Sequence, residues 1–226
     1  LVRNLTKKNY RCIISTRKTF QKGYLKTQAT PGAIELIEWN PNNFLGLKQA
    51  IKNSDIVINL IGILYETRKQ KFYNIHSGIP EAVSKICSES DVKKFIHVSA
   101  IGASETSKSL YQKSKYQGEV KALNNFKNTV IVRPSVVCGT EDNFTNLFSK
   151  LSFLPVIPVV GIKYKFQPIL VTDVADAILK VIESKGCEEK IYEIGGPKVI
   201  SFGDMVRSIL KTINKKRFVV EMPMPI

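Results

Sequence analysis

The stretch that decides the fold is KFIHVSAIGASETSKSLYQKSKYQGE, from Lys94 to Glu119. It begins with an apolar run, Phe95 to Val98, which has no helical period and predicts a short buried strand. A loop rich in Ser, Gly and Ala follows, and a predicted helix then carries Tyr111 and Lys115. Residues four apart lie about one helical turn from each other, so we expect the phenol and the ammonium on the same face.

This pair points to proton transfer. An ammonium close to a phenol favours the phenolate, so we expect Lys115 to lower the pKa of Tyr111 below its usual value of about 10. Such a tyrosine can pass a proton to or from an alcohol or carbonyl oxygen. Tyr and Lys at this spacing also occur as plain surface pairs on solvated helices. The buried strand and the small-residue loop before the helix favour the catalytic interpretation.

Strands and helices alternate on both sides of this stretch, which is typical of βαβ units with a mostly parallel sheet. The sequence therefore predicts an α/β protein with a Rossmann-type, doubly wound parallel sheet. We expect residues 1–226 to form a single domain, with residues 1–139 as a nucleotide-binding core and residues 140–226 adding core elements and a small substrate lobe. The predicted strands are 11–15, 34–39, 56–62, 95–98, 129–134, 167–171 and 191–194, and the predicted helices are 44–53, 79–90, 172–185 and 202–213.

Three residues lie at or just past the ends of predicted strands: Gly62, Ser99 and Pro134. The carboxyl ends of parallel strands meet at one edge of the sheet, and ligands of such folds bind there. We therefore expect these residues at the binding edge.

The usual opening of a dinucleotide fold is not found. That opening is a strand, a glycine-rich turn and a helix whose N-terminus meets the pyrophosphate. This sequence begins with Leu1 to Lys8, which resembles the end of an amphipathic helix, and it contains no G-x-x-G-x-x-G. We expect the fold to be truncated, lacking the first strand and the glycine-rich loop.

Composition narrows the classes of function. Of the residues, 43% are hydrophobic, and no apolar run approaches the roughly 18 residues that span a membrane. The four cysteines are far apart and the two histidines, His76 and His97, have no metal-ligand spacing, so we expect neither a disulfide nor a metal site. The net charge of +15 fits nucleic acid, an anionic membrane or an anionic cofactor. The basic residues are scattered, so nucleic acid is the least favoured partner.

The sequence resembles the extended and atypical short-chain dehydrogenase/reductase superfamily. Within it, the closest likeness is to the nucleotide-binding accessory subunit of respiratory complex I, the alpha-subcomplex subunit 9 type, and its bacterial relatives. The segments that carry the resemblance are NLIG (59–62), FIHVSA (95–100), YQKSK (111–115) with Gly118 and Glu119, IVRPSVVCG (131–139), FQPILVTDVADAI (166–178) and YEIGGP (192–197).

The resemblance implies a role for several residues. Tyr111 would be the proton donor, and Lys115 would hold the ribose and modify the pKa. Ile61, Gly62 and Val98 would line the cofactor, and Pro134 and Val137 would flank the nicotinamide.

The family's catalytic serine falls on Ala100 here, with Ser99 one residue earlier. An offset of one residue on a strand turns a side chain to the opposite face. Losing such a hydrogen-bond donor typically costs about two to three orders of magnitude in rate.

The choice of cofactor depends on the end of the strand 11–15. In these folds an acidic residue there binds the 2′-hydroxyl of NAD. This strand ends Ser15-Thr16-Arg17, without a carboxylate, and an arginine can grip a 2′-phosphate with two hydrogen bonds. We expect NADP(H) to be preferred, with NAD(H) possible. Arg17 could also simply face solvent.

Two functions remain open. One is an NAD(P)H-binding accessory or stabilising subunit of NADH:ubiquinone oxidoreductase with little or no turnover. The other is an active reductase or epimerase that uses the Tyr-Lys pair on a carbonyl, sugar or quinone-like substrate. The resemblance also implies complex I subunits and an anionic membrane face as partners. It implies a cytoplasmic or mitochondrial matrix-side location, peripheral to the inner membrane.

Overall fold

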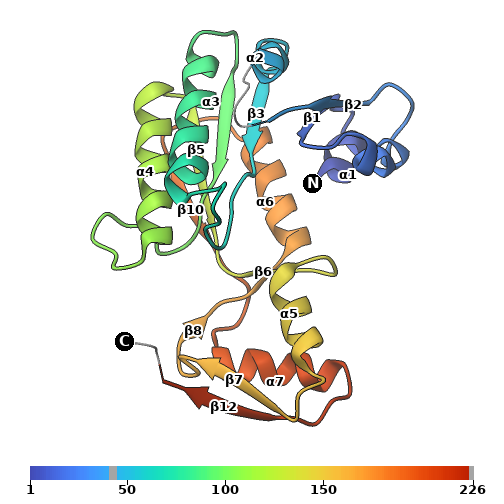
Figure 1. The fold of residues 1–226 in the computed structure, drawn as a ribbon. Helices are drawn as coiled ribbons and strands as arrows, with labels where there is room; N and C mark the ends of the chain where they lie inside the picture. Colours follow the sequence, from blue (N-terminus) through green and yellow to red (C-terminus); the bar gives the residue numbers. More distant parts are fainter. Residues whose placement is uncertain (41–44, 224–226) are drawn as a thin grey trace. The chain divides into compact units, whose positions relative to one another are not determined.

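The computed structural model describes residues 1–40 and 45–223. Its contacts divide the chain into two compact units (Figure 1). The first consists of Leu1–Arg133 with Ala175–Glu193, and the second of Pro134–Val174 with Ile194–Ile226. The chain therefore passes from the first unit to the second after Arg133, returns at Ala175 and leaves again after Glu193.

The first unit contains the expected parallel sheet. Its order is β10-β5-β4-β3, and β4 pairs in parallel with both β3 and β5. The unbroken apolar runs form these strands because both faces of the sheet are covered. The strands are β3 (Ile56–Asn59), β4 (Lys94–Val98), β5 (Thr129–Pro134) and β10 (Ile191–Ile194).

Helices cover both faces of this sheet (Figure 1). On one face lie a π-helix, η2 (Tyr73–Gly78), then α3 (Ile79–Ser88) and α4 (Leu110–Asn125). Part of α6 (Val171–Glu183) lies on the other face, where the Lys94 ammonium donates to the carbonyl oxygens of Val181 at 2.8 Å and Ser184 at 2.6 Å. A cation at the C-terminus of a helix satisfies carbonyls that have no partner within the helix.

The core of the first unit lies between the sheet and the η2–α3–α4 face. It includes Ile75, Ile79, Phe95 and Ala122, together with Trp39. The sheet and this helical layer therefore share one hydrophobic core.

A buried ion pair attaches α4 to the sheet. Arg133 of β5 donates from Nε to Glu119 at 2.9 Å and from a terminal nitrogen at 2.6 Å, and also binds Glu193 of β10 at 3.1 Å. Such a two-pronged geometry fixes orientation as well as distance.

The first part of the chain forms a smaller sheet. β1 (Cys12–Thr16) pairs in parallel with β2 (Ile34–Glu38), and Cys12 lies opposite Ile34. Among the described residues this pair is a sheet separate from the four-stranded one. Its neighbours along the chain are α1 (Val2–Lys7), η1 (Phe20–Gln28) and α2 (Leu45–Lys52).

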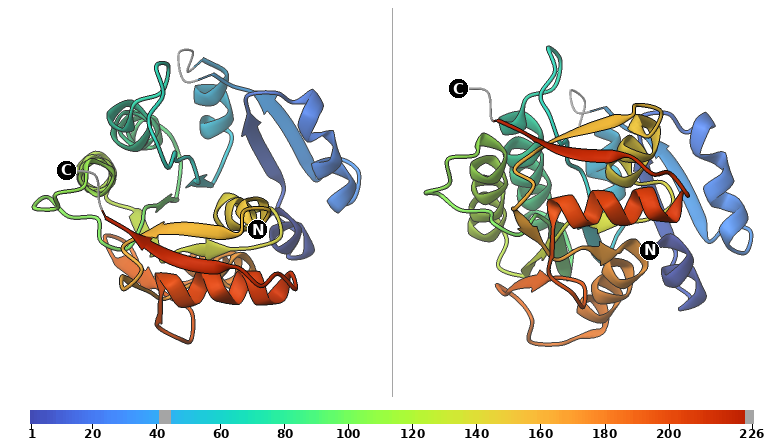
Figure 2. Two further views of the ribbon diagram at one scale, coloured as in Figure 1. Left: turned by 60° about the horizontal axis from the view of Figure 1, so that its bottom comes forward. Right: turned by 90° about the horizontal axis from the view of Figure 1, so that it is seen from below.

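The second unit has its own core. β7 (Val156–Val160) pairs in parallel with β12 (Phe218–Met222), and Figure 2 shows the two strands side by side with α7 against them. Phe148, Ile157, Val159, Val206 and Leu210 form the core. The other elements are β6 (Val137–Cys138), α5 (Asn143–Leu151), β8 (Lys165–Phe166), β9 (Ile169–Leu170), β11 (Ile200–Ser201) and α7 (Phe202–Thr212).

Several predicted boundaries are wrong. β3 ends at Asn59 rather than residue 62, because the Asn59 side chain accepts the Ile61 N–H at 3.0 Å and turns the chain out of the sheet. The start of the helix predicted at 44–53 lies outside the described residues. Helix α5 and strands β7 and β12 were not predicted.

Candidate active site at the carboxyl edge of the sheet

The loops after β3 and β4 and the start of α4 meet at one edge of the sheet. Ser99 follows β4 directly, and Gly62 lies three residues beyond β3. A side chain on Gly62 would come within 3.2 Å of the Lys115 ammonium, so the β3 loop passes very close to α4. The structure thus brings Gly62, Ser99, Tyr111 and Lys115 into one region, as the parallel topology predicts.

Lys115 is buried inside this region and is 4% exposed. Its Nζ donates to the carbonyl oxygen of Val98 at the end of β4, at 3.3 Å. Burial lowers the pKa of Lys115 to about 8, and the nearby Glu119 opposes that shift only in part. At neutral pH the side chain is therefore a mostly protonated donor beside the strand end.

Tyr111 differs from the expectation. Burial raises the pKa of its phenol, so the prediction that Lys115 lowers it is wrong. The ring packs edge-on against His76, with centroids 5.1 Å apart, and against Phe72 at 5.7 Å. The ammonium instead donates to the Val98 carbonyl, and burial of the phenol disfavours its charged form.

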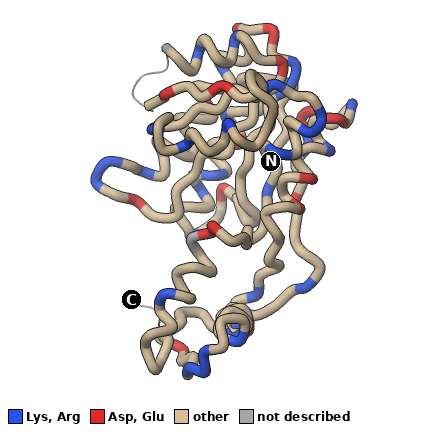
Figure 3. The backbone as a smooth tube through the Cα atoms, turned by 90° about the vertical axis from the view of Figure 1, so that its right-hand side faces the viewer, with Lys and Arg blue, Asp and Glu red and all other residues tan. Residues whose placement is uncertain are grey.

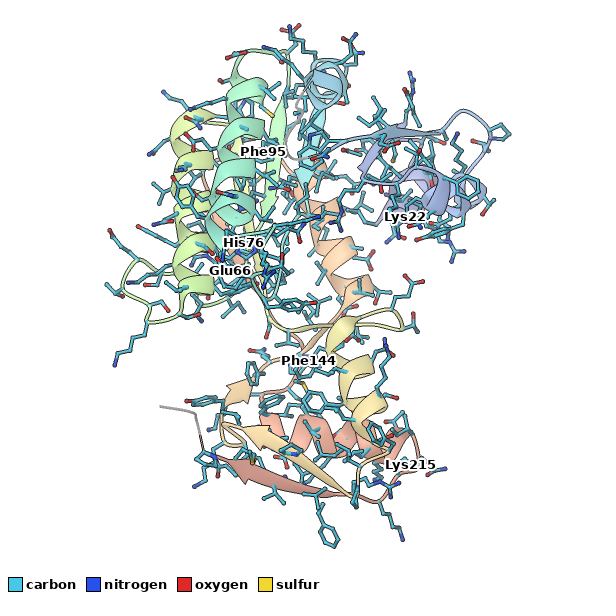
Figure 4. All side chains as sticks on the ribbon, viewed as in Figure 1. Lys22, Glu66, His76, Phe95, Phe144 and Lys215 are labelled. Atoms are coloured by element: carbon cyan, nitrogen blue, oxygen red, sulfur yellow. The ribbon has the colours of Figure 1, made fainter. Side chains whose placement is uncertain are left out.

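His76 connects the β3 loop to α4. Its Nε2 accepts the Ile63 N–H at 3.0 Å, which leaves the proton on Nδ1. Nδ1 then donates to Ser114 Oγ at 2.9 Å, and Ser114 donates to the Tyr111 carbonyl at 2.7 Å. Burial and the charge of Lys115 lower the pKa of His76 to about 4, so it stays neutral. Figure 4 labels His76 on η2 in the first unit.

His97 is the second buried histidine. Asn59 donates to its Nδ1 at 3.2 Å, and the ring is completely buried. Burial and the charge of Lys115 lower the pKa of His97 to about 3. The remaining ring nitrogen and the Ser99 hydroxyl are buried and have no hydrogen-bond partner among the described residues. Buried polar atoms without partners are uncommon and often mark ligand sites.

The residues expected to choose the cofactor lie at the end of β1. Thr16 ends the strand and accepts the Trp39 N–H at 3.0 Å, and Arg17 follows, exposed. The Ser15 hydroxyl is buried without a partner among the described residues. Pro134 is the last residue of β5 and Val137 lies in β6, and both belong to the second unit.

These features fit a dinucleotide. The ammonium of Lys115 of α4 beside the end of β4, a close-packed glycine after β3, and hydroxyls of Ser15 and Ser99 without partners among the described residues are groups that a ribose or nicotinamide could satisfy. Within the described residues, 1–40 and 45–223, no group of three or more His, Cys, Asp or Glu side chains could hold a metal ion. In the same residues, no helix is long and apolar enough to cross a membrane.

Sequence reasoning missed Phe72, His76 and Ser114 as parts of the site. His76 carries a hydrogen-bond chain as well as packing. The sequence offered one weak signal for His76. The chain has only two histidines, and His97 lies on the predicted strand that leads to the binding edge.

Comparison with known proteins gives a family match. The family model described as "RmlD substrate binding domain" matches residues 62–226. This match covers most of the chain and includes Tyr111 and Lys115.

Curated relatives resemble the chain over nearly its whole length. The mouse protein "NADH dehydrogenase [ubiquinone] 1 alpha subcomplex subunit 9, mitochondrial" is 30% identical over 219 residues, 96% of this chain and 56% of the mouse protein. The protein of the same name from Dictyostelium discoideum is 36% identical over 190 residues, 82% of this chain and 52% of that protein. The chain thus spans about half the length of the curated relatives it matches.

Solved structures share the fold at low identity. UDP-glucuronic acid 4-epimerase from Bacillus cereus, in complex with UDP-glucuronic acid and NAD, has a TM-score of 0.80 at 18% identity, covering 98% of this chain and 82% of the epimerase. The dTDP-4-dehydrorhamnose reductase from Bacillus anthracis, in complex with NADP, has a TM-score of 0.74 at 18% identity, covering 95% and 85%. These likenesses show the Rossmann-type α/β fold.

Proposed function

The chain belongs to the RmlD substrate binding domain family, and we propose that it is an NAD(P)H-binding accessory subunit of NADH:ubiquinone oxidoreductase with little or no turnover. The observation that carries the dinucleotide part is the buried ammonium of Lys115, which α4 places at the carboxyl end of β4 beside Gly62. The relatives named as complex I subunits, which match 82% to 96% of the chain, support the assembly part.

The surroundings of Tyr111 support a low turnover. A general acid or base works best with a pKa near the working pH. Burial moves the pKa of the Tyr111 phenol upward, away from neutrality, and its ring is held among other rings. Ala100 stands where the family has its serine, and Ser99 is buried. An active reductase or epimerase is the alternative, supported by the proximity of Tyr111 and Lys115 on α4.

Further parts of the proposal concern location and partners. The relatives are named as mitochondrial, and we infer a position on the matrix side, peripheral to the inner membrane, with complex I subunits and an anionic membrane face as partners. Sedimentation of the protein with NADH:ubiquinone oxidoreductase activity in detergent-solubilised membranes tests this. Recovery only in soluble fractions without that activity would contradict it.

Substitutions of the site residues test the binding role. We expect Lys115→Ala to weaken NADPH binding by about ten- to a hundredfold, because a charged hydrogen-bond donor is lost. Tyr111→Phe should bind almost normally. Titration by nucleotide fluorescence measures both variants, with Lys113→Ala, an exposed lysine of the same helix, as the matched control.

The pH dependence sharpens this test. The pKa of Lys115 is about 8, so the affinity should fall as the pH rises through that value and the ammonium is lost. Lys115→Ala should not show this fall. Normal binding by Lys115→Ala would contradict the site, and a carbonyl reduction that Tyr111→Phe abolishes would establish the enzyme alternative.

The preference for NADP(H) over NAD(H) is a separate proposal that rests on Arg17. Removing a guanidinium from a 2′-phosphate should lower NADPH affinity by about ten- to a hundredfold and leave NADH affinity unchanged. The matched control is Arg11→Ala, at the other end of β1 and paired with Glu35 at 2.9 Å. Equal affinities for the two cofactors, with Arg17→Ala silent on both, would contradict the preference.

A further inference from the structure

One end of the second unit combines positive charge with exposed aromatic rings. The parallel strands β7 and β12 both begin there, with Val156 opposite Phe218. Two hydrogen bonds join the segments that lead into these strands. Arg217 Nε donates to the Ser152 carbonyl at 2.8 Å, and the Phe218 N–H donates to the Pro155 carbonyl at 3.2 Å. Phe153 and Phe218 are therefore brought to one end, and they are 76% and 77% exposed.

Lysines and arginines surround these rings. A pocket of about 380 Å³ lies at the end of α7 and the start of β12, and Lys215, labelled in Figure 4, belongs to it. Its lining residues are Arg207, Leu210, Lys211, Lys215, Lys216, Arg217 and Phe218. We call this pocket, with Phe153, the basic aromatic end.

The lysines of this end have no acidic partner among the described residues. The segments 143–160 and 205–220 contain no Asp or Glu. Arg207 pairs with Asp204 at 2.9 Å on the exposed helix surface. Lys211, Lys215 and Lys216 are exposed and are in no ion pair among the described residues. Figure 3 shows Lys and Arg along the whole chain, so basic residues alone do not distinguish this end.

The exposed face of the neighbouring β7–β12 ribbon is aliphatic. Val156, Pro158 and Val160 point away from the core on β7, and Val220 and Met222 do so on β12. Exposed apolar patches beside charge mark interaction sites. An occupant must therefore offer negative charge to the lysines and hydrocarbon to the phenylalanines and the ribbon.

We propose that the basic aromatic end docks on an anionic phospholipid bilayer, with lipid phosphates at Lys211, Lys215 and Lys216 and with Phe153 and Phe218 inserted at the headgroup boundary. Lysines near an anionic membrane surface and apolar rings in the boundary both contribute to such binding. The inference gives a particular site to the peripheral membrane position proposed above. It does not depend on dinucleotide binding.

Vesicle binding tests the proposal. Co-sedimentation of the protein is measured with vesicles of phosphatidylcholine alone and of phosphatidylcholine mixed with phosphatidylglycerol. We expect binding to the mixed vesicles only, weakened by salt because exposed charges are screened. The variant Lys211→Gln/Lys215→Gln/Lys216→Gln should bind roughly a hundredfold more weakly, from about 1 kcal/mol for each lysine.

A matched triple variant controls for net charge. Lys26→Gln/Lys108→Gln/Lys127→Gln removes the same charge from exposed positions of the first unit and should bind as the unaltered protein does. Phe153→Ser should weaken binding to the mixed vesicles and leave the salt dependence unchanged. Thermal unfolding of each variant shows whether it is folded.

Three outcomes would overturn the proposal: equal binding to both kinds of vesicle, equal losses in the two triple variants, or binding to single-stranded RNA with none to the vesicles. NADPH affinity of the Lys211, Lys215 and Lys216 variant separates the two proposals. If this variant loses vesicle binding and keeps its NADPH affinity, the result bears on the basic aromatic end alone. If a protein binds vesicles normally and does not bind NADPH, the result bears on the dinucleotide site alone.

Discussion

At the scale of single residues, burial decides the chemistry of the site. Lys115 and Tyr111 occupy one face of α4, yet their pKa values shift in directions set by desolvation rather than by their proximity: downward for the ammonium and upward for the phenol. His76 and His97 remain neutral for the same reason and can accept or donate hydrogen bonds without adding charge. The positive charge that an anionic cofactor could use is therefore the one on Lys115.

The buried histidines predict an acid sensitivity. The pKa of His76 is about 4 in the folded protein, below the usual value of about 6.5. Between these values the unfolded chain binds a proton that the folded chain does not, so the free energy of unfolding falls as the pH falls through this window. The loss should be roughly 3 kcal/mol for His76. Chemical denaturation at pH 6.5 and at pH 5 measures the first part of this loss in the free energy of unfolding.

The control is His76→Gln, which cannot titrate and keeps an acceptor for the Ile63 N–H. This variant should be less stable at neutral pH and lose less stability between the two pH values. An unchanged pH slope would show that the pKa of His76 is not lowered in the folded protein.

At the scale of elements, close approach between η2 and α4 positions the site. A side chain at Gly118 would overlap the carbonyl oxygen of His76, so α4 can reach η2 only where a hydrogen replaces the side chain. The π-helix η2 then directs His76 at Ser114 and the β3 loop. π-helical turns often occur at functional sites.

Gly118→Ala should therefore destabilise the protein, because a backbone carbonyl cannot move aside as a flexible side chain can. We expect a loss of about 3 kcal/mol in the free energy of unfolding, measured by chemical denaturation, together with weaker NADPH binding. Gly23→Ala in η1 is the matched control, because no atom lies within 4 Å of the added methyl group. Its effect should stay within about 1 kcal/mol. Similar stability of the two variants would contradict this packing.

At the scale of the whole molecule, the chain forms two units with separate hydrophobic cores. The first core includes Trp39, the only tryptophan of the sequence, and the second is built around Ile157 and Val206. Units with their own cores can unfold independently. The fluorescence of Trp39 reports on the first unit, whereas circular dichroism reports on both.

Ile157→Ala should separate the two transitions. Ile157 is completely buried, and its truncation should cost about 2–5 kcal/mol. We expect the unfolding midpoint measured by circular dichroism to fall, while the unfolding midpoint measured by Trp39 fluorescence is unchanged. Ile79→Ala, in the first core, should lower the Trp39 midpoint. If Ile157→Ala lowers both midpoints equally, the units unfold as one.

The sequence by itself determined the elements that depend on local pattern. Unbroken apolar runs predicted β4 and β5, because strands covered on both faces need apolar side chains throughout. The alternation of strands and helices predicted the parallel sheet and its binding edge, and the spacing of Tyr111 and Lys115 placed both on one face of α4. The family resemblance, confirmed by the RmlD match and the curated relatives, followed from these segments in order.

Only the tertiary structure decided what surrounds those residues. Desolvation and long-range hydrogen bonds depend on segments distant in sequence, such as Phe72 and His76 beside Tyr111, so the rise in the pKa of its phenol could not be read from spacing. The pairing of β7 with β12 joins residues about sixty apart, and a short valine run alone does not specify its partner. The basic aromatic end exists because that pairing brings Phe153 and Phe218 together.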